Sequence, residues 1–213
     1  MITLKPGNCF AEESEVSDMN YITTPNIIKE TNRGYDSYRI IDEMLSHREI
    51  QCVGEINADS VYSLIMQLQH LYREDPEAEI TMYINSPGGE VNSGLALYDI
   101  MQAIKAPIRT VCVGMAASMA SILFAAGDRR EILPHAAVMI HDPLIPGGVG
   151  GSALRIRSLS DDLMRTRTLI AEILAKHTGK SVEEIYEKTA TDTFFYGEDA
   201  VAYGLADNVI TSL

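Results

Sequence analysis

The feature that most constrains this chain is a repeated change from a strand pattern to a helix pattern. Ile80–Ile84 is a short apolar strand pattern that stops at an Asn-Ser-Pro-Gly-Gly turn, and helical spacing of apolar residues follows. Ile108–Val113 also ends at a glycine, and a third strand pattern, Ala137–Ile140, ends at His141. Strands that alternate with helices connect through right-handed crossovers into a largely parallel sheet. We therefore expect an α/β fold.

Helical spacing of apolar residues predicts further elements around these strands. Helices are expected at Ile41–Leu45, Val61–Leu71, Leu95–Ile104, Ser118–Ala126 and from about Glu198, with one more strand at Ile50–Val53. The longest helical pattern runs from Ser152 to His177 and is closed by Gly179. At 1.5 Å per residue, a helix of about 25 residues spans roughly 40 Å, more than a small domain covers. We expect it to project and meet a partner; the alternative is a surface helix that lies across its own core.

Length and charge exclude several classes of protein. A chain of 213 residues suits one domain, whose core is built from its 46% hydrophobic residues. Its 17 basic and 30 acidic residues give a net charge of −13, which repels phosphate backbones and anionic lipid surfaces. We therefore expect neither a nucleic-acid nor a membrane partner.

The cysteines and the N-terminal residues indicate a cytoplasmic location. Cys9, Cys52 and Cys112 are scattered, odd in number and without metal-ligand spacing, so neither a disulfide framework nor a metal site is expected. The apolar runs fall short of the ~18 residues that a membrane helix needs. Residues 1–20 are acidic, the reverse of a targeting segment, and are expected to form a flexible tail.

Three groups suited to chemistry follow the carboxyl ends of the predicted strands, the edge at which ligands bind in open α/β sheets. They are the pair Gly88–Gly89, then Ser118 and His141. A glycine pair permits positive φ and close approach to a ligand, so its N–H groups can hold an oxyanion. On local sequence alone, Ser118 also fits a helix cap and His141 a core histidine. The other histidines adjoin polar stretches and are expected to be solvated: His47, His70, His135 and His177.

Six segments together resemble the proteolytic subunits of the Clp protease family. They are ETNRGYDSY (30–38), YINSPGG (83–89), GLALYDIM (94–101), AASM (116–119), VMIHDP (138–143) and YGLAD (203–207). They occur in the family's order over roughly residues 25–212, which is far more specific than a single motif. The resemblance implies a Clp/crotonase-like fold: repeated β-β-α units, a mostly parallel sheet and a projecting long handle helix.

The resemblance implies a serine endopeptidase and a role for each site residue. Ser118 is the implied nucleophile, His141 its general base and Asp192 the third member of the triad. The backbone N–H groups of Gly89 and Met119 form the implied oxyanion hole. A serine hydroxyl needs such a base, and the oxyanion that develops needs donors already in position.

The acidic member of the triad rests on the resemblance. By themselves, the residues fit Asp192 to a turn or cap position ahead of the predicted helix near Glu198. They do not favour it over Asp142 or Asp128. The choice of Asp192 is therefore what the resemblance implies.

The resemblance also implies an assembly. Subunits of this family stack as two seven-membered rings around a chamber, and an ATP-driven AAA+ unfoldase of the ClpX, ClpA or ClpC type delivers unfolded proteins. No cofactor is implied, because ATP belongs to the partner. The implied layout is one peptidase domain, 21–213, in which 21–37 is an axial segment, 38–141 and 181–213 form the head, and 142–180 is the handle.

Several positions depart from the family's pattern. The substrate channel is implied at Gly88, Gly147 and Gly148, but the stretch around the last two lacks the family's usual glutamine. Asp142 replaces another glutamine and adds negative charge beside the triad. Thr191 stands where many members carry an arginine that joins neighbouring subunits. These changes predict weaker or less active rings and suggest a divergent paralogue.

The unfoldase is implied to dock in clefts whose aromatic lining matches Thr81, Tyr83 and Glu131, of which only Tyr83 is aromatic here. We expect Glu131 to place an unpaired carboxylate under the partner's apolar loop, which is costly. Rings of this chain alone should then bind an unfoldase poorly and depend on a paralogue ring. The alternative is a one-residue slip in the alignment that puts Ile132 in the cleft and Glu131 in solvent.

Two other functions are open on the sequence. A crotonase-like acyl-CoA enzyme has a related fold and also uses paired N–H groups around an oxyanion, but Ser118 and His141 at consecutive strand ends favour hydrolysis. A regulatory, weakly active ring subunit of a paralogue is suggested by Thr191 and the altered glycine segment. The complete triad argues against that second alternative.

Overall fold

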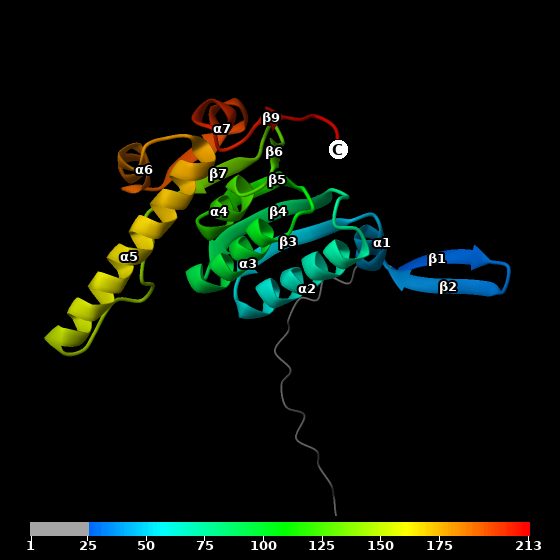
Figure 1. Cartoon of the computed structure of the whole chain (residues 1–213), viewed down its shortest axis with the longest axis horizontal. Coiled ribbons are helices and arrows are strands. Elements are labelled where there is room, and N and C mark those ends of the chain that lie inside the picture. The colour runs from blue at the N-terminus through cyan, green and yellow to red at the C-terminus, as the bar shows by residue number, and fades with distance from the viewer. Residues whose placement is uncertain (1–25) are drawn as a thin grey trace, which may run out of the picture. The chain divides into compact units, whose positions relative to one another are not determined.

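The computed structural model describes residues 26–213 (Figure 1). The predicted acidic tail, residues 1–20, therefore lies outside the described residues. Two compact units are present, of which the first ends at Ile40 and the second is Ile41–Leu213.

The described part of the first unit is a β-hairpin. Its antiparallel strands are β1 (Asn26–Thr31) and β2 (Gly34–Arg39). The Thr31 hydroxyl closes the turn by donating a hydrogen bond to the Gly34 carbonyl at 3.1 Å. The axial position that the resemblance implies for this segment stays a prediction.

The second unit alternates strands and helices along most of its length (Figure 1). Its elements are α1 (Ile40–Ser46), which begins at the unit boundary, β3 (Glu49–Ile56), α2 (Ala58–Glu74), β4 (Ile80–Gly89), α3 (Val91–Ala103), β5 (Ile108–Ala117), α4 (Met119–Ala125), β6 (Arg129–Ile132), β7 (Ala137–Ile140), α5 (Ala153–Thr178), α6 (Val182–Thr189), β8 (Thr193–Tyr196), α7 (Gly197–Tyr203) and β9 (Asn208–Val209). The sheet follows the order β3-β4-β5-β6-β9, while β7 pairs with β5 and β8 with β7. All these pairs are parallel except β7 with β8. The predicted α/β fold with a largely parallel sheet is confirmed.

Strand β5 is central to the sheet because its two halves pair with different neighbours. Arg109–Cys112 pairs with β6, and Met115–Ala117 pairs with β7. The sequence pattern ends this strand at Val113 and ends β4 at Ile84, and both predicted ends are wrong. Pairing continues past an irregularity in β4, as far as Gly89, because a bulge lets the backbone bend and regain its partners.

Helix α2 shows how the periodic pattern builds the core. Val61, Leu64, Leu68 and Leu71 recur at three- and four-residue spacing, and all four are buried. Each such side chain contributes about 1.5–3 kcal/mol when it leaves water. The helix begins after Asn57, whose side chain accepts a hydrogen bond from a first-turn backbone N–H at 3.0 Å. Helix α3 lies beside α2 (Figure 1), and every residue of α4 is buried.

Helix α5 is held mainly at one end. It follows the N-cap Ser152 and ends at Gly179, so the predicted ends are confirmed to within a residue. Its buried residues all lie near the C-terminal end, namely Ile170, Ala171, Ile173 and Leu174. Leu154 and Met164 are exposed, and this part of the helix extends away from the sheet (Figure 1), so the alternative of a helix across its own core is wrong. Neither α5 nor any other helix within residues 26–213 is long and apolar enough to cross a membrane.

Candidate active site

Ser118 lies at a sharp junction between the end of β5 and the start of α4. Its φ of 53° and ψ of −124° are outside the conformations that residues with side chains ordinarily adopt. Its N–H donates to the Met139 carbonyl at 2.9 Å, and its own carbonyl accepts from Ser121 Oγ at 2.6 Å and from the Ser121 N–H at 3.0 Å. Ser118 occupies the N-cap position of α4, but within the described residues its hydroxyl makes no capping hydrogen bond, so the alternative of a capping side chain is wrong.

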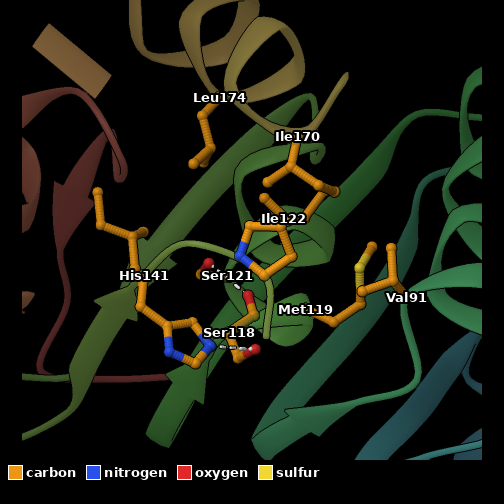
Figure 2. Close-up of a pocket in the computed structure, with 10 residues that line it drawn as sticks. Val91, Ser118, Met119, Ser121, Ile122, His141, Ile170 and Leu174 are labelled. Atoms are coloured by element: carbon orange, nitrogen blue, oxygen red, sulfur yellow. Dashed lines mark hydrogen bonds between the residues drawn. The ribbon is translucent and has the colours of Figure 1, made fainter. Parts of the chain in front are cut away.

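The His141 side chain faces the Ser118 hydroxyl, with Nε2 2.8 Å from Oγ (Figure 2). His141 follows β7, whose antiparallel register with β8 sets Ile140 opposite Thr193. Continuing that register by one residue places His141 opposite Asp192. Their side chains meet there, with His141 Nδ1 3.2 Å from Asp192 Oδ1. The three residues that the resemblance selects thus form one chain of contacts.

The glycine pair at the end of β4 brings its backbone against Ser118. A Cβ added to Gly88 would lie 2.7 Å from the Ser118 Cβ and 2.9 Å from the Met119 nitrogen. Only glycine fits distances this short, and the φ of Gly88 is also positive, at 92°. The Gly88 N–H already donates to Ser86 Oγ at 3.1 Å, so Gly89 is the better oxyanion donor of the pair. Met119 begins α4, where the first N–H groups lack a helical partner.

A narrow apolar pocket of about 20 Å³ adjoins the Ser118 hydroxyl (Figure 2). Its apolar lining comes from three helices and a strand end: Val91, Met119, Ile122, Ile140, Ile170 and Leu174. The sequence pointed to Met119 through its backbone N–H, but it did not indicate the other five residues or the supporting Ser121. No local signal marks them, because they are ordinary core positions in segments far apart along the chain.

A larger groove of about 510 Å³ also reaches Ser118 and His141. Pro87 and Gly89 lie on its β4 side, and Pro146 belongs to the loop that follows β7. The predicted channel residues are placed differently from one another. Gly88 lies against Ser118, whereas Gly147 and Gly148 follow Pro146 and have open space where a Cβ would be.

Asp142 places a carboxylate beside the triad, and that carboxylate has a cation and a hydroxyl in contact with it. Its Oδ2 lies 2.6 Å from Arg167 Nε in α5, and its Oδ1 accepts a hydrogen bond from Thr189 Oγ1 at 2.7 Å. The negative charge that Asp142 adds next to His141 is therefore balanced by the guanidinium. Thr191, at the position of the implied arginine, is exposed.

The positions implied in partner docking lie on adjacent strands. Tyr83 and Glu131 share one register row across β4, β5 and β6, and Thr81 lies two residues before Tyr83. Glu131 is only 6% exposed, and its Oε2 lies 2.5 Å from Arg109 Nη2. The expectation of an unpaired carboxylate is therefore wrong, because the neighbouring strand supplies the cation. Ile132 is fully buried, so the alternative of a one-residue slip is wrong as well.

Tyr83 borders a separate hollow of about 360 Å³. Apolar side chains at Met44, Val53, Val113 and Leu213 share its lining. Burial raises the pKa of Tyr83, which keeps the phenol neutral. Glu49, Gln51 and Asn85 also line this hollow, and of the three positions implied in docking it includes Tyr83 but not Thr81 or Glu131.

His177 and two buried cysteines are further titratable groups near the core. The expectation that His177 is solvated is wrong, because its ring is half-buried and its Nε2 lies 3.0 Å from Tyr98 OH. Burial lowers the pKa of His177 to about 4. Burial also raises the pKa of Cys52 to about 11 and that of Cys112 to about 12, so both thiols stay protonated. Within residues 26–213, no three His, Cys, Asp or Glu side chains gather in a way that could hold a metal ion.

The match to known proteins covers nearly the whole described chain. A model of the Clp protease family matches residues 32–213. This range contains the contacts of Ser118, His141 and Asp192, the glycine pair and the apolar pocket. The mostly parallel sheet and the projecting α5 agree with the Clp/crotonase-like fold that the resemblance implies.

Proposed function

Because the chain belongs to the Clp protease family and is a peptidase by that membership, we propose that it is a serine endopeptidase whose nucleophile is Ser118. One observation carries the proposal. Contacts run without a break from Ser118 Oγ to His141 Nε2 at 2.8 Å, and from His141 Nδ1 to Asp192 Oδ1 at 3.2 Å. Nucleophile, base and orienting carboxylate in this order define the triad of serine peptidases.

The first half of the reaction forms an acyl-enzyme. Ser118 Oγ attacks the peptide carbonyl carbon as His141 Nε2 accepts the hydroxyl proton. Asp192 holds the ring in the tautomer with a proton on Nδ1 and stabilises the cation that forms. The carbonyl electron pair moves onto oxygen, where the N–H groups of Gly89 and Met119 hold it. Donors of this kind are worth about 10²–10³ in rate.

The second half releases the products. The tetrahedral intermediate collapses as His141 gives its proton to the leaving amine nitrogen, and the C–N bond breaks. A water then attacks the ester carbonyl, with His141 again accepting a proton, and the acid product leaves as Ser118 regains its hydrogen. No cofactor takes part in these steps.

The hollows around Ser118 suggest how a peptide binds. The pocket that Ile170 and Leu174 share with α4 residues accepts an apolar side chain beside the scissile bond. The groove between Pro87 and Pro146 has room for an extended chain that continues past the nucleophile. A chain that continues on both sides of the cleaved bond is the substrate of an endopeptidase.

Members of this family work as parts of oligomeric protease complexes. We infer two stacked seven-membered rings, in which the exposed part of α5, with Leu154 and Met164, meets another subunit. An AAA+ unfoldase that consumes ATP would dock near Tyr83 and feed unfolded proteins to the chamber. The alternative of a weakly active regulatory subunit is supported by the altered glycine segment and by Thr191, which offers neighbouring subunits no charged group.

The decisive experiment is reaction with a serine-directed fluorophosphonate, followed by mass-spectrometric mapping of the labelled residue. We expect the label on Ser118. Ser118→Ala should lose the label and lower the rate of peptide cleavage by about 10⁴-fold or more, because a triad acts as a unit. Ser63→Ala, on the exposed face of α2, is the matched control. A label elsewhere, or cleavage retained by Ser118→Ala, contradicts the proposal, and an intact triad that labels only in mixed rings favours the regulatory subunit.

A further inference from the structure

Two hydrogen bonds join Asp142, the residue after His141, to Thr189 at the end of the helix that precedes Asp192. We call these two bonds the clasp. The Asp142 N–H donates to the Thr189 carbonyl at 2.7 Å, and Thr189 Oγ1 donates to Asp142 Oδ1 at 2.7 Å. Thr189 is the last residue of α6, where helix carbonyls have no partner within the helix, so the first bond satisfies a group that needs one. The clasp lies one residue beyond His141 and three residues before Asp192.

The triad needs such a fixing point because the sheet stops short of it. The last paired residues of β7 and β8 are Ile140 and Thr193, and His141 and Asp192 lie just past them. The Asp192 side chain is 65% exposed, so packing does little to hold it. Thr193 Oγ1 donates to the Lys188 carbonyl at 2.7 Å. The short segment that carries Asp192 is thus tied at both ends, by this bond and by the clasp.

A third element joins the clasp through Arg167 of α5. Its Nε lies 2.6 Å from Asp142 Oδ2, and its guanidinium lies over the Tyr186 ring of α6, 3.8 Å from the ring centroid. The Tyr186 hydroxyl in turn donates to Thr168 Oγ1 of α5 at 3.3 Å. A charge-assisted, partly buried pair of this kind is stronger than an exposed ion pair. One carboxylate therefore connects the end of β7, α5 and α6.

Resting on the proposed function, we propose that Asp142 and Thr189 are positioning residues that fix His141 against Asp192, and that Arg167 makes this fixing depend on the placement of α5. Helix α5 also supplies Ile170 and Leu174 to the pocket beside Ser118. A shift of α5 would therefore move the pocket wall and the clasp together. The competing account is that the β7–β8 pairing alone aligns the triad and that the clasp only stabilises the fold.

The clean test of the clasp is Thr189→Val, because it keeps the side-chain shape, changes no charge and removes the hydroxyl. We expect kcat for a short apolar peptide to fall about tenfold, with KM unchanged within about twofold, because small displacements of catalytic groups act on the transition state. Thr189→Ser restores the hydroxyl and should restore kcat. Thr166→Val is the matched control, since that hydroxyl donates to a carbonyl of α5 away from the site.

The contact between Arg167 of α5 and Asp142 is tested by two variants. They are Arg167→Gln and the charge-balanced pair Asp142→Asn with Arg167→Gln. Both should lower kcat and the rate of fluorophosphonate labelling at Ser118 about five- to tenfold. Arg165→Gln, which removes an exposed arginine from the same helix, should change neither rate. If Thr189→Val does not fold, the charge-balanced pair decides by the same criteria.

The outcomes separate this proposal from the one on which it rests. A wild-type chain that neither labels nor cleaves contradicts the proposed function. A wild-type chain that labels, with Thr189→Val and the Arg167 variants labelling and cleaving at the same rate, overturns the positioning roles alone. A lower melting temperature with unchanged kcat, or a loss of kcat that Thr189→Ser does not restore, overturns them too.

Discussion

The two ends of strands β4 and β5 both carry polar side chains, and the chain uses them in opposite ways. At the carboxyl end, Ser118 is held at a positive φ and lines an open groove, and its chain of contacts through His141 ends at the exposed Asp192. Toward the other end, Glu131 of the neighbouring β6 is buried, and it and the partly buried Arg109 of β5 balance each other's charge. The comparison teaches that the residue type does not distinguish chemistry from structure. What distinguishes them is whether the paired side chains border an open groove, as Ser118 and His141 do, or lie within the fold, as Glu131 does.

Breaking the buried pair should have the largest effect on stability. Arg109→Leu leaves the Glu131 carboxylate buried without its nearest cation, and we expect a loss of about 3 kcal/mol, or roughly 6–12 °C in melting temperature. The labelling rate of Ser118 in the folded variant should not change. Thermal denaturation and fluorophosphonate labelling measure the two effects.

The double variant Arg109→Leu with Glu131→Leu sharpens this result. Replacing both charges by apolar side chains should recover most of the lost stability, since no buried charge is then left alone. A double variant as unstable as the single one would show that the pair is not the cause.

The opposite end should respond through activity. Gly88→Ala places a Cβ 2.6 Å from the Ala117 carbonyl oxygen and 2.7 Å from the Ser118 Cβ, so the nucleophile must move. We expect peptide cleavage to fall about 10²-fold. Gly179→Ala is the matched control, because its φ of 71° is also positive but its surroundings are open. Equal losses in the two variants would mean that backbone strain, and not crowding at Ser118, is responsible.

A third region of the molecule also holds a polar side chain, His177, whose partner is Tyr98. In the unfolded chain a histidine titrates near 6.5, whereas burial lowers the pKa of His177 in the fold to about 4. As pH falls below 6.5 the unfolded state therefore binds the proton first, and the free energy of unfolding declines until pH approaches 4. Melting temperatures across this range should fall more steeply for the wild type and for His70→Gln than for His177→Gln. Parallel curves would contradict the assignment.

The smallest effect is expected at the docking hollow. Thr81→Tyr adds an aromatic ring on the face of β4 that carries Tyr83, and should tighten unfoldase binding to rings of this chain by a few fold, about 1 kcal/mol. Glu131 is not a suitable target, because its removal leaves Arg109 unpaired. Tyr83→Ser should weaken binding in the same assay, and no change in either variant would exclude this hollow as the docking surface.

Many of the helices and strands could be predicted, because the sequence patterns that indicate them are local. Val61 to Leu71 carry a regular apolar stripe, and Ser152 and Gly179 bound a long helical pattern, so α2 and α5 follow from the sequence. Ser118 and His141 follow from the rule that parallel strands present their carboxyl ends at one edge.

The remainder depends on which strands become neighbours. Arg109 meets Glu131 across 22 positions and Asp142 meets Arg167 across 25, and no periodic pattern encodes either contact. Strands β6 and β8 have four residues each, too few for an alternating pattern to be distinguished from a loop. Asp192 acquires its position from contacts between segments far apart in the sequence, among them the pairing of β8 with β7, and for this reason the residues alone did not single it out.

At Ser118 the stability of the fold and the activity of the site make opposite demands. The positive φ strains the backbone, and the side chain that causes the strain carries the nucleophile. Replacing Ser118 by glycine would remove this backbone strain and raise the free energy of unfolding by about 1 kcal/mol. Alanine and other residues with a Cβ would retain the strain. A screen that ranked variants of this chain by melting temperature alone would therefore favour losing the nucleophile. A more thermostable variant of the chain should keep the residues of this junction. Stabilising substitutions are better placed on the exposed face of α2, where no conflict of this kind exists.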